Sequence, residues 1–261
     1  MKRVLLAFAV LSAAAVITSG AGSYPRTLGG RQVGAADTVR DNEQAVAALE
    51  KIGVPLQRDT SGRVRWIEAA QGEFNDEAIR HLSGLPLLEW LEIGGGNVTA
   101  AGLARLKGCT ALRRLYIHDV HLSDDALAAL GNLANLEALS LQKTGITGKG
   151  LKHLKANGSL RVLNLSGDDI DDEDLGLVAH FAGLEVLALQ NTKVSGAGLA
   201  KLAGLKRLNV LNLVNCRIVD GDMDYFTSMP NLRIVHAAGC NISENVIDQF
   251  KDRLPMLAIF K

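Results

Sequence analysis

The sequence has no excess of charge of either sign, because Lys and Arg together number 28 and Asp and Glu also number 28. This balance argues against a broadly basic binder of nucleic acid or anionic membranes, although it leaves a local patch open. Aromatic residues are scarce at 4%, so Leu and Ala must build most of any core. With 48% hydrophobic and 21% charged residues, the composition is that of a packed soluble protein rather than a disordered chain.

Cysteine is rare and recognisable catalytic motifs are absent. The three cysteines, Cys109, Cys216 and Cys240, are too few for a disulfide framework, and no CxxC spacing suggests zinc. The sequence contains no GxSxG, HExxH, P-loop or dinucleotide-binding pattern. Its hydroxyls, carboxylates and histidines also form no set of nucleophile, base and orienting group. We therefore expect neither enzymatic activity nor a cofactor.

Long hydrophobic runs are missing too. The apolar run over residues 4–17 is shorter than the roughly 20 residues of a membrane-spanning helix. Two basic residues precede it and small residues follow at 19–21, which predicts a signal peptide over residues 1–21. An uncleaved N-terminal anchor is the alternative. Cleavage would leave a periplasmic or extracellular protein with no integral membrane segment. Residues 22–40 show no core pattern and predict a flexible linker.

The strongest signal is a repeat of 24 residues, in which apolar columns recur without gaps. One column is Phe74, Val98, Leu122, Ile146, Ile170, Val194, Ile218 and Ile242. Another is Ile79, Leu103, Leu127, Leu151, Leu175, Leu199, Met223 and Ile247. The columns define eight units over residues 64–256, followed by a fragment at residues 257–261 that begins after a spacing of 25.

Each unit combines two periodicities. An LxxLxL segment alternates like a short strand, and the segment after it has helical spacing. A residue suited to capping a helix separates the two in most units: Asn75, Thr99, Ser123, Thr147, Asp171, Ser195 and Ser243. Before the repeats, residues 41–63 predict an N-terminal cap made of a helix and a hairpin. Residues 257–261 predict a C-terminal strand that closes the stack.

These columns resemble the leucine-rich-repeat family, and most closely its 24-residue subtype of secreted bacterial proteins. The resemblance covers residues 64–261 and includes the "TGIT" and "GL" signatures at Thr144–Thr147 and Gly150–Leu151. It implies an α/β solenoid, a right-handed superhelix with a concave parallel sheet and short convex helices. The family's Asn column is replaced here by Gly72, Gly96, Val120, Thr144, Asp168, Thr192, Cys216 and Cys240. We expect the two cysteines in it to be free, buried thiols.

Outward strand positions have no packing role in such a fold, so they can be examined for function. The third position of each unit carries Trp66, Trp90, Arg114, Ala138, Val162, Val186, Val210 and Ile234. Trp, Tyr and Arg are enriched at binding hot spots. We therefore predict a binding patch on the concave face, consisting of Trp66, Trp90, Glu92, Arg114, Tyr116 and His118. Trp66 could instead pack beneath the cap.

Several functions are compatible with this patch. The hypothesis we favour is an exported, non-catalytic protein that binds another protein through its concave face. One alternative is a carbohydrate-binding module that uses Trp66 and Trp90 as a sugar platform. Another is a host-directed effector, because the repeats are similar to those of substrate receptors in ubiquitin ligases, although no F-box-like segment precedes them. No nucleic-acid partner is expected.

Three further patterns have structural explanations. The second position carries Arg65, Glu89, Arg113, Glu137, Arg161, Glu185, Asn209 and Arg233, which predicts a ladder of ion pairs that sets strand register. The pair His118 and His121 could bind a metal, but no third ligand is evident, so a solvated loop is favoured. The six carboxylates over residues 168–174 could bind calcium, yet Asp171 there already serves as a helix cap.

Overall fold

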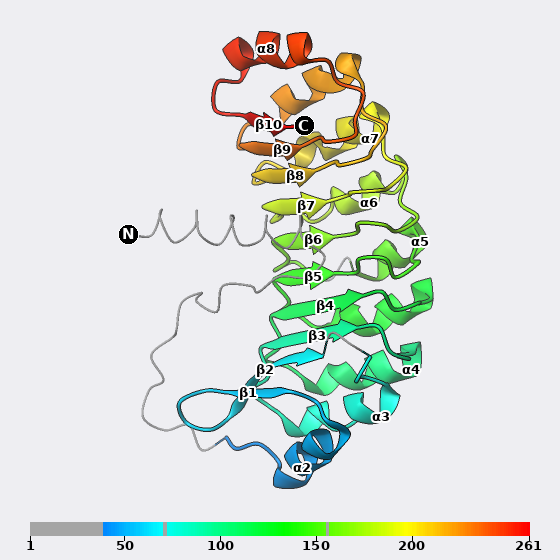
Figure 1. Cartoon of the computed structure of the whole chain (residues 1–261), viewed down its shortest axis with the longest axis vertical. Coiled ribbons are helices and arrows are strands. Elements are labelled where there is room, and N and C mark those ends of the chain that lie inside the picture. The colour runs from blue at the N-terminus through cyan, green and yellow to red at the C-terminus, as the bar shows by residue number, and fades with distance from the viewer. Residues whose placement is uncertain (1–38, 70–71, 155–156) are drawn as a thin grey trace.

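The computed structural model describes residues 39–69, 72–154 and 157–261. Ten strands form a single sheet in which each strand lies beside the next one in the chain (Figure 1). Strands β1 and β2 pair antiparallel, and every later neighbour pairs parallel. The strands are β1 Leu56–Arg58, β2 Val64–Ala69, β3 Trp90–Gly94, β4 Arg114–His118, β5 Ala138–Ser140, β6 Val162–Asn164, β7 Val186–Ala188, β8 Val210–Asn212, β9 Ile234–His236 and β10 Ala258–Phe260.

Short helices cover one side of this sheet, and the stack curves so that the sheet lies on the inside (Figure 1). The α-helices are α2 Glu43–Ile52, α3 Asp76–Ile79, α4 Ala100–Leu103, α5 Gly148–Leu151, α6 Leu175–Val178, α7 Gly196–Lys201 and α8 Glu244–Arg253. Stretches of 3-10 helix follow or replace them at Leu82–Gly84, Ala104–Gly108, Asp124–Asn132, Lys152–Leu154, Leu202–Gly204 and Asp220–Ser228. This is the predicted solenoid with a parallel inner sheet and short outer helices.

The main core lies between the sheet and the helices. Leu91, Leu115 and Leu139 occupy the same position in adjacent strands and are fully buried. The predicted apolar columns and the LxxLxL segments together supply most of the buried side chains, in one continuous cluster that runs the length of the stack. No single unit could bury its own apolar face, so stacking is what removes this surface from water.

The first strands are covered by the segment before them. Helix α2 begins after Asn42, whose side chain accepts a hydrogen bond from the Ala45 N–H at 3.0 Å, and it ends at Gly53 with a φ of 88°. Strand β1 then forms a hairpin with β2. At the far end, Leu257 packs against the core, while Ile259 pairs with Val235 and so returns to the 24-residue register.

Of the five neighbouring pairs of opposite charge in the column from Arg65 to Glu185, three form ion pairs in the structure, so the predicted ladder is present in part. Arg65 lies 2.9 Å from Glu89, Arg161 lies 2.5 Å from Glu185, and Arg113 also pairs with Glu137. Each of these pairs joins an odd-numbered unit to the next even-numbered one. Because they are partly exposed, each contributes about 0–1 kcal/mol, and their main effect is on register.

A second link has the same 48-residue period and was missed from the sequence. The Asp76 carboxylate accepts hydrogen bonds from Thr99 in the next unit, at 2.8 Å from the backbone N–H and 2.5 Å from the hydroxyl. The same arrangement joins Asp124 to Thr147, Asp172 to Ser195 and, through the backbone N–H, Asp220 to Ser243. The stack is thus built from pairs of units. In each pair, an Asp of the first unit places its carboxylate at the start of the helical segment of the second unit.

In the column that replaces the family's Asn, two side chains donate hydrogen bonds to backbone carbonyls of the preceding unit. The thiols of Cys216 and Cys240 donate to the carbonyls of Leu189 and Leu213, at 3.0 and 3.1 Å. The prediction of free, buried thiols is confirmed, and Cys109 is likewise free and buried. Burial raises the pKa of all three, that of Cys109 to about 12, so they stay protonated at neutral pH.

The predicted signal peptide and nearly all of the predicted linker lie outside the described residues. Within the described ranges, none of the helices has the length and hydrophobicity needed to cross a bilayer.

Candidate binding face

Strand register places the predicted site residues beside one another on the inner face of the sheet. Trp66, Trp90 and Arg114 align across β2, β3 and β4. In the adjacent row, Glu92 lies beside Tyr116, and His118 continues β4. We call the side chains of Trp66, Trp90, Glu92, Arg114, Tyr116 and His118 the aromatic patch. The six residues come together because the 24-residue spacing repeats without a shift between these strands.

The centre of the aromatic patch is a contact between two rings. Trp90 and Tyr116 meet edge to face, with centroids 5.7 Å apart and planes at 78°. The Arg114 guanidinium lies 5.8 Å from the Trp90 centroid, within the range of a cation–π interaction. Trp66 packs against this cluster, which is separate from the main core. Trp66 thus belongs to the concave patch and is not part of the core beneath the cap.

Trp90 is much less accessible than an outward-facing strand position suggests, because only 3% of it is exposed. Tyr116 is buried as well, and the two rings pack with Ala138. Burial raises the pKa of the Tyr116 hydroxyl to about 12, so it remains protonated. Periodicity correctly placed these side chains on the concave face but could not reveal how closely neighbouring rings cover one another.

Charged groups border the rings, with Glu92 in the middle of β3 and with His118 and Asp119 at the end of β4. His118 Nε2 lies 3.2 Å from a Glu92 carboxylate oxygen, and its Nδ1 lies 3.0 Å from Asp119. The hydrogen bond with Glu92 is the main reason that the pKa of His118 is raised, with Asp119 adding to the effect. The pKa of Asp119 is lowered, chiefly by His118. Lys143 lies 3.5 Å from the other Asp119 oxygen, which extends this chain of charges to the next unit.

Beyond the aromatic patch, the strand positions on the concave face carry mainly β-branched and amide side chains. Val186, Ala188 and Val210 are buried together, with Val162 and Ile234 packed at the two ends. Asn164 and Asn212 lie between them, and each accepts a hydrogen bond from the backbone N–H two residues later, at 2.9 and 3.0 Å. The face therefore has two parts, an aromatic and charged part at β2–β4 and a β-branched part at β6–β9.

Neither candidate metal site gains support. Among the residues that the structure describes, no group of three or more His, Cys, Asp or Glu side chains is arranged to hold an ion. In the acidic segment, Asp171 accepts hydrogen bonds from the backbone N–H groups of Glu173 and Asp174 at 2.9 and 3.3 Å. Asp171 thus caps the turn that leads into α6, whereas the residue directly before this helix is Asp174, so the predicted helix cap lies three residues too early.

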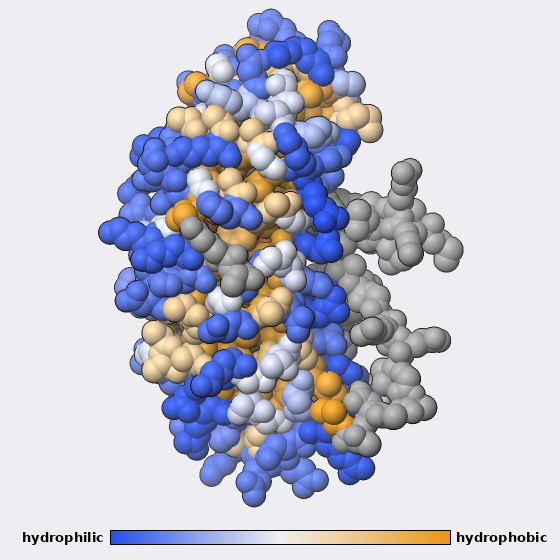
Figure 2. Space-filling model, turned by 180° about the vertical axis from the view of Figure 1, so that it is seen from behind, coloured by the Kyte–Doolittle hydropathy of each residue, from blue (hydrophilic) through white to orange (hydrophobic). Residues whose placement is uncertain are grey.

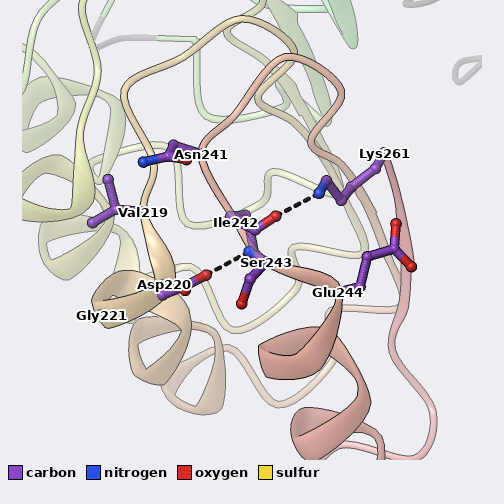
Figure 3. A pocket seen from close by; sticks show the side chains of 8 residues that line it. All are labelled: Val219, Asp220, Gly221, Asn241, Ile242, Ser243, Glu244 and Lys261. Atoms are coloured by element: carbon purple, nitrogen blue, oxygen red, sulfur yellow. Dashed lines mark hydrogen bonds between the residues drawn. The ribbon is translucent and has the colours of Figure 1, made fainter.

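A shallow pocket of about 540 Å³ opens at the C-terminal end of the stack, away from the aromatic patch. Figure 3 shows the side chains of its lining: Val219, Asp220, Gly221, Asn241, Ile242, Ser243, Glu244 and Lys261. Two contacts cross it, from the Ser243 N–H to Asp220 at 2.6 Å and from Lys261 Nζ to the Ile242 carbonyl at 2.5 Å. Two of its charged groups, Asp220 and Lys261, are therefore already engaged.

Comparison with known proteins supports the fold assignment. No family model and no curated protein matches the chain. Among solved structures, the chain is similar to the crystal structure of an internalin C2 from Listeria monocytogenes, with a TM-score of 0.58 and 23% identity. The match covers 83% of this chain and 90% of that one. Together with the repeated columns and the ten-stranded sheet, this likeness shows that the chain has the fold of the leucine-rich-repeat proteins.

Proposed function

We propose that this chain is an exported, non-catalytic leucine-rich-repeat protein that binds a protein partner through its concave face. The observation that carries the proposal is the aromatic patch, where the partly exposed Trp66 and Arg114 side chains pack against the buried rings of Trp90 and Tyr116. Large rings and a guanidinium are the groups that most often anchor protein interfaces, because they bury much area with few lost rotamers.

The rest of the face suits the same class of partner. The β-branched row from Val162 to Ile234 crosses β6–β9, with Val186 and Val210 buried in its middle and Val162 and Ile234 partly exposed at its two ends. A protein partner can contact these exposed apolar side chains, whereas nucleic acid needs a basic surface. Export rests on the basic start and apolar run within residues 1–21.

The two alternatives have no structural observation in their favour. A platform of two open aromatic faces is not formed, because Trp90 is buried beside Tyr116 and Arg114, which leaves Trp66 as the one partly exposed tryptophan. An effector role in ubiquitin transfer would need a segment that recruits a ligase, and the described residues consist of the repeats and the elements at their two ends.

The test is a comparison of three forms of the full chain as bait in extracts and culture medium of the native host. Arg114→Glu reverses a charge over the Trp90 ring, whereas Arg105→Glu makes the same change at an exposed position on the helical side. Proteins captured by the wild type are identified by mass spectrometry, and their affinities are then measured by titration.

We expect at least one captured protein to bind the Arg105→Glu variant as it binds the wild type. The same protein should bind Arg114→Glu more than about tenfold less tightly, because an anchor at the centre of an interface contributes about 2 kcal/mol or more. Equal binding of all captured proteins to both variants would exclude the aromatic patch as the binding site.

A further inference from the structure

Two charged side chains on the concave face have no partner of opposite charge among the described residues. Glu68 lies on β2 two residues after Trp66, so both side chains leave the strand on the side away from the core, and Glu68 is partly exposed. No ion pair or hydrogen bond within the described ranges involves its carboxylate. Arg114 on β4 is also partly exposed, and its guanidinium contacts the Trp90 ring but pairs with none of the described carboxylates.

Unpaired charges are unusual on this face. On the helical side, hydrophilic residues cover most of the surface (left in Figure 2), so a single charge without a partner carries no information there. On the concave face, the strand positions over β5–β8 carry only apolar, hydroxyl and amide side chains. A charge at a partly buried position loses hydration without gaining a counter-ion, and a bound partner of opposite charge supplies what is missing.

Strand register makes the need for a cation at Glu68 stronger. Glu68 lies directly beside Glu92 across β2 and β3, at the usual strand spacing of about 4.8 Å. Two carboxylates in register repel each other. Glu92 has the His118 ring as a partner on the side of β4, at 3.2 Å, whereas Glu68 has no such partner among the described residues. A cation from outside the chain is therefore the group that would balance this end of the face.

The two unpaired charges are separated by a distance that a short extended segment can span. From Glu68 to Arg114, the sheet advances by two strands and steps back by two residues along the strand direction. At about 4.8 Å per strand and about 3.3 Å per residue, the two Cα atoms are about 12 Å apart. Along an extended chain, residues i and i+4 point to the same side and are about 13 Å apart. Residue i+2 also points to that side, and it would lie over β3, next to Trp90.

We propose that the occupant of this end of the concave face is an extended segment of a partner protein, with a basic residue at one position and an acidic residue four positions away. The basic side chain pairs with Glu68 and lies beside the partly exposed Trp66, which a Lys or Arg can contact as a cation–π pair. The acidic side chain pairs with Arg114, whose planar fork of N–H groups suits a carboxylate. The residue midway between them lies next to Trp90, so an apolar side chain fits there.

This inference rests on the proposed function, because it names the class of partner that the same face binds. It adds a requirement for the sign and the spacing of two charges, which the aromatic patch alone does not impose. The two charges do not determine the direction of the bound segment, since a basic residue can come before or after the acidic one.

The probe is a five-residue peptide with blocked ends, Lys-Ala-Leu-Ala-Glu, used together with its reversed sequence. The peptide Gln-Ala-Leu-Ala-Gln removes both charges, and Lys-Glu-Ala-Leu-Ala keeps both charges at the wrong spacing. Each peptide is titrated into the isotope-labelled full chain at low salt. The two tryptophans of the chain give two indole N–H signals in NMR spectra, which a Trp66→Phe variant assigns.

Variants of the chain test each proposed contact separately. Glu68→Gln and Arg114→Gln each remove one charge from the site, and Glu43→Gln is the control, at an exposed position on α2. Glu68→Lys reverses the charge at the first position, so its preferred peptide should become Glu-Ala-Leu-Ala-Glu. Melting curves establish that each variant is folded.

We expect Lys-Ala-Leu-Ala-Glu, in one of its two orders, to shift the indole signals saturably and to bind the wild type and Glu43→Gln equally. The neutral and wrongly spaced peptides should bind the wild type more than about fivefold less tightly, and Glu68→Gln and Arg114→Gln should bind the matched peptide with a similar loss. Glu68→Lys should prefer the peptide with two Glu residues. Equal binding of all peptides, no saturable shift, or a Glu68→Lys variant that keeps the wild-type preference would overturn the proposal.

The outcome can be separated from that of the capture experiment. A captured protein that loses affinity for Arg114→Glu but binds Glu68→Lys as tightly as the wild type would contradict this inference and leave the proposed function intact. If every captured protein binds Arg114→Glu as it binds the wild type, the proposed function fails as well.

Discussion

Replacing Asp168 with Asn should stabilise the protein, and by an amount that depends on pH. Asp168 is only 4% exposed. One of its carboxylate oxygens accepts hydrogen bonds from the Thr144 and Gly145 N–H groups at 2.7 and 2.8 Å. Its other oxygen, Oδ2, is buried with no hydrogen-bond partner among the described residues. Burial therefore disfavours the charged form and raises the pKa of Asp168 to about 7.

The sign of the effect follows from this raised pKa. Unfolding returns the carboxyl to its ordinary pKa of 3.8, so between pH 4 and 7 the folded state holds more protons than the unfolded state. The contribution of Asp168 is then fully present below pH 4 and is lost as the pH rises through 7. A difference of about three pKa units corresponds to about 4 kcal/mol, since each unit is worth about 1.4 kcal/mol.

The asparagine side chain in the Asp168→Asn variant would not titrate. Its amide can both accept from the N–H donors on one side and donate to a carbonyl on the other. The carbonyl oxygen can accept the Thr144 and Gly145 N–H groups as the carboxylate does. The amide nitrogen can donate towards the Leu141 carbonyl. In the same column, the Cys216 thiol donates to the Leu189 carbonyl, which also lies 27 residues earlier in the chain. The substitution also restores the residue type that is usual in this column of the family.

Urea unfolding of the wild type and Asp168→Asn at one-unit steps from pH 4 to 8 measures the effect. Taking the difference between the two proteins at each pH cancels the other titrating groups, including His118, which the substitution leaves in place. The free energy of unfolding of the variant should gain on that of the wild type by about 1–1.4 kcal/mol per unit between pH 4 and 7, and then level off. A difference that is constant with pH would refute the reasoning, and so would a wild type that is the more stable protein at pH 8.

Three further predictions concern packing and the links between units. Trp90→Ala should lower the free energy of unfolding by about 3–5 kcal/mol, because the buried ring loses its contacts; a value near zero would mean that its burial contributes little. Asp124→Ala should lower the free energy of unfolding by about 1.5–3 kcal/mol, because it removes two hydrogen bonds to a carboxylate. The control Asp125→Ala, at an exposed position, should lower it by less than about 0.5 kcal/mol. Equal losses in urea unfolding would contradict a role for the link between Asp124 and Thr147. Cys216 and Cys240 should react with a thiol reagent only at the rate of unfolding, since both are buried and protonated; fast labelling of the native protein would show that they are accessible.

The Trp90 prediction reverses what the sequence alone suggests. A side chain on the outward side of a strand is expected to be removable at little cost to folding, and the sequence places Trp90 there. In the structure its ring is buried by Tyr116, Arg114 and Ala138. Trp90 is therefore a structural residue of the aromatic patch, which is why Arg114 and not Trp90 is the informative position for a binding test.

The repeat, the strand-and-helix unit and the alternating charge ladder were readable from the sequence. A 24-residue period determines which residues are neighbours in adjacent units. Residues that are 24 apart in the sequence therefore lie side by side in adjacent strands. The ion pairs of Arg65, Arg113 and Arg161 follow from that relation, as does the grouping of Trp90, Arg114 and Tyr116. In a solenoid, nearly all contacts run between neighbouring units, so sequence spacing determines them.

The tertiary structure alone decided the features that depend on side-chain direction and on water exclusion. Asp76 and Asp124 are ordinary helix-start residues in the sequence, and only their orientation towards the next unit makes them links. The burial of Trp90 and the unpartnered oxygen of Asp168 also depend on which atoms surround each group in three dimensions. A period specifies which residues are neighbours, but burial and hydrogen bonding depend on distances of a few tenths of an ångström, which only the packed structure sets.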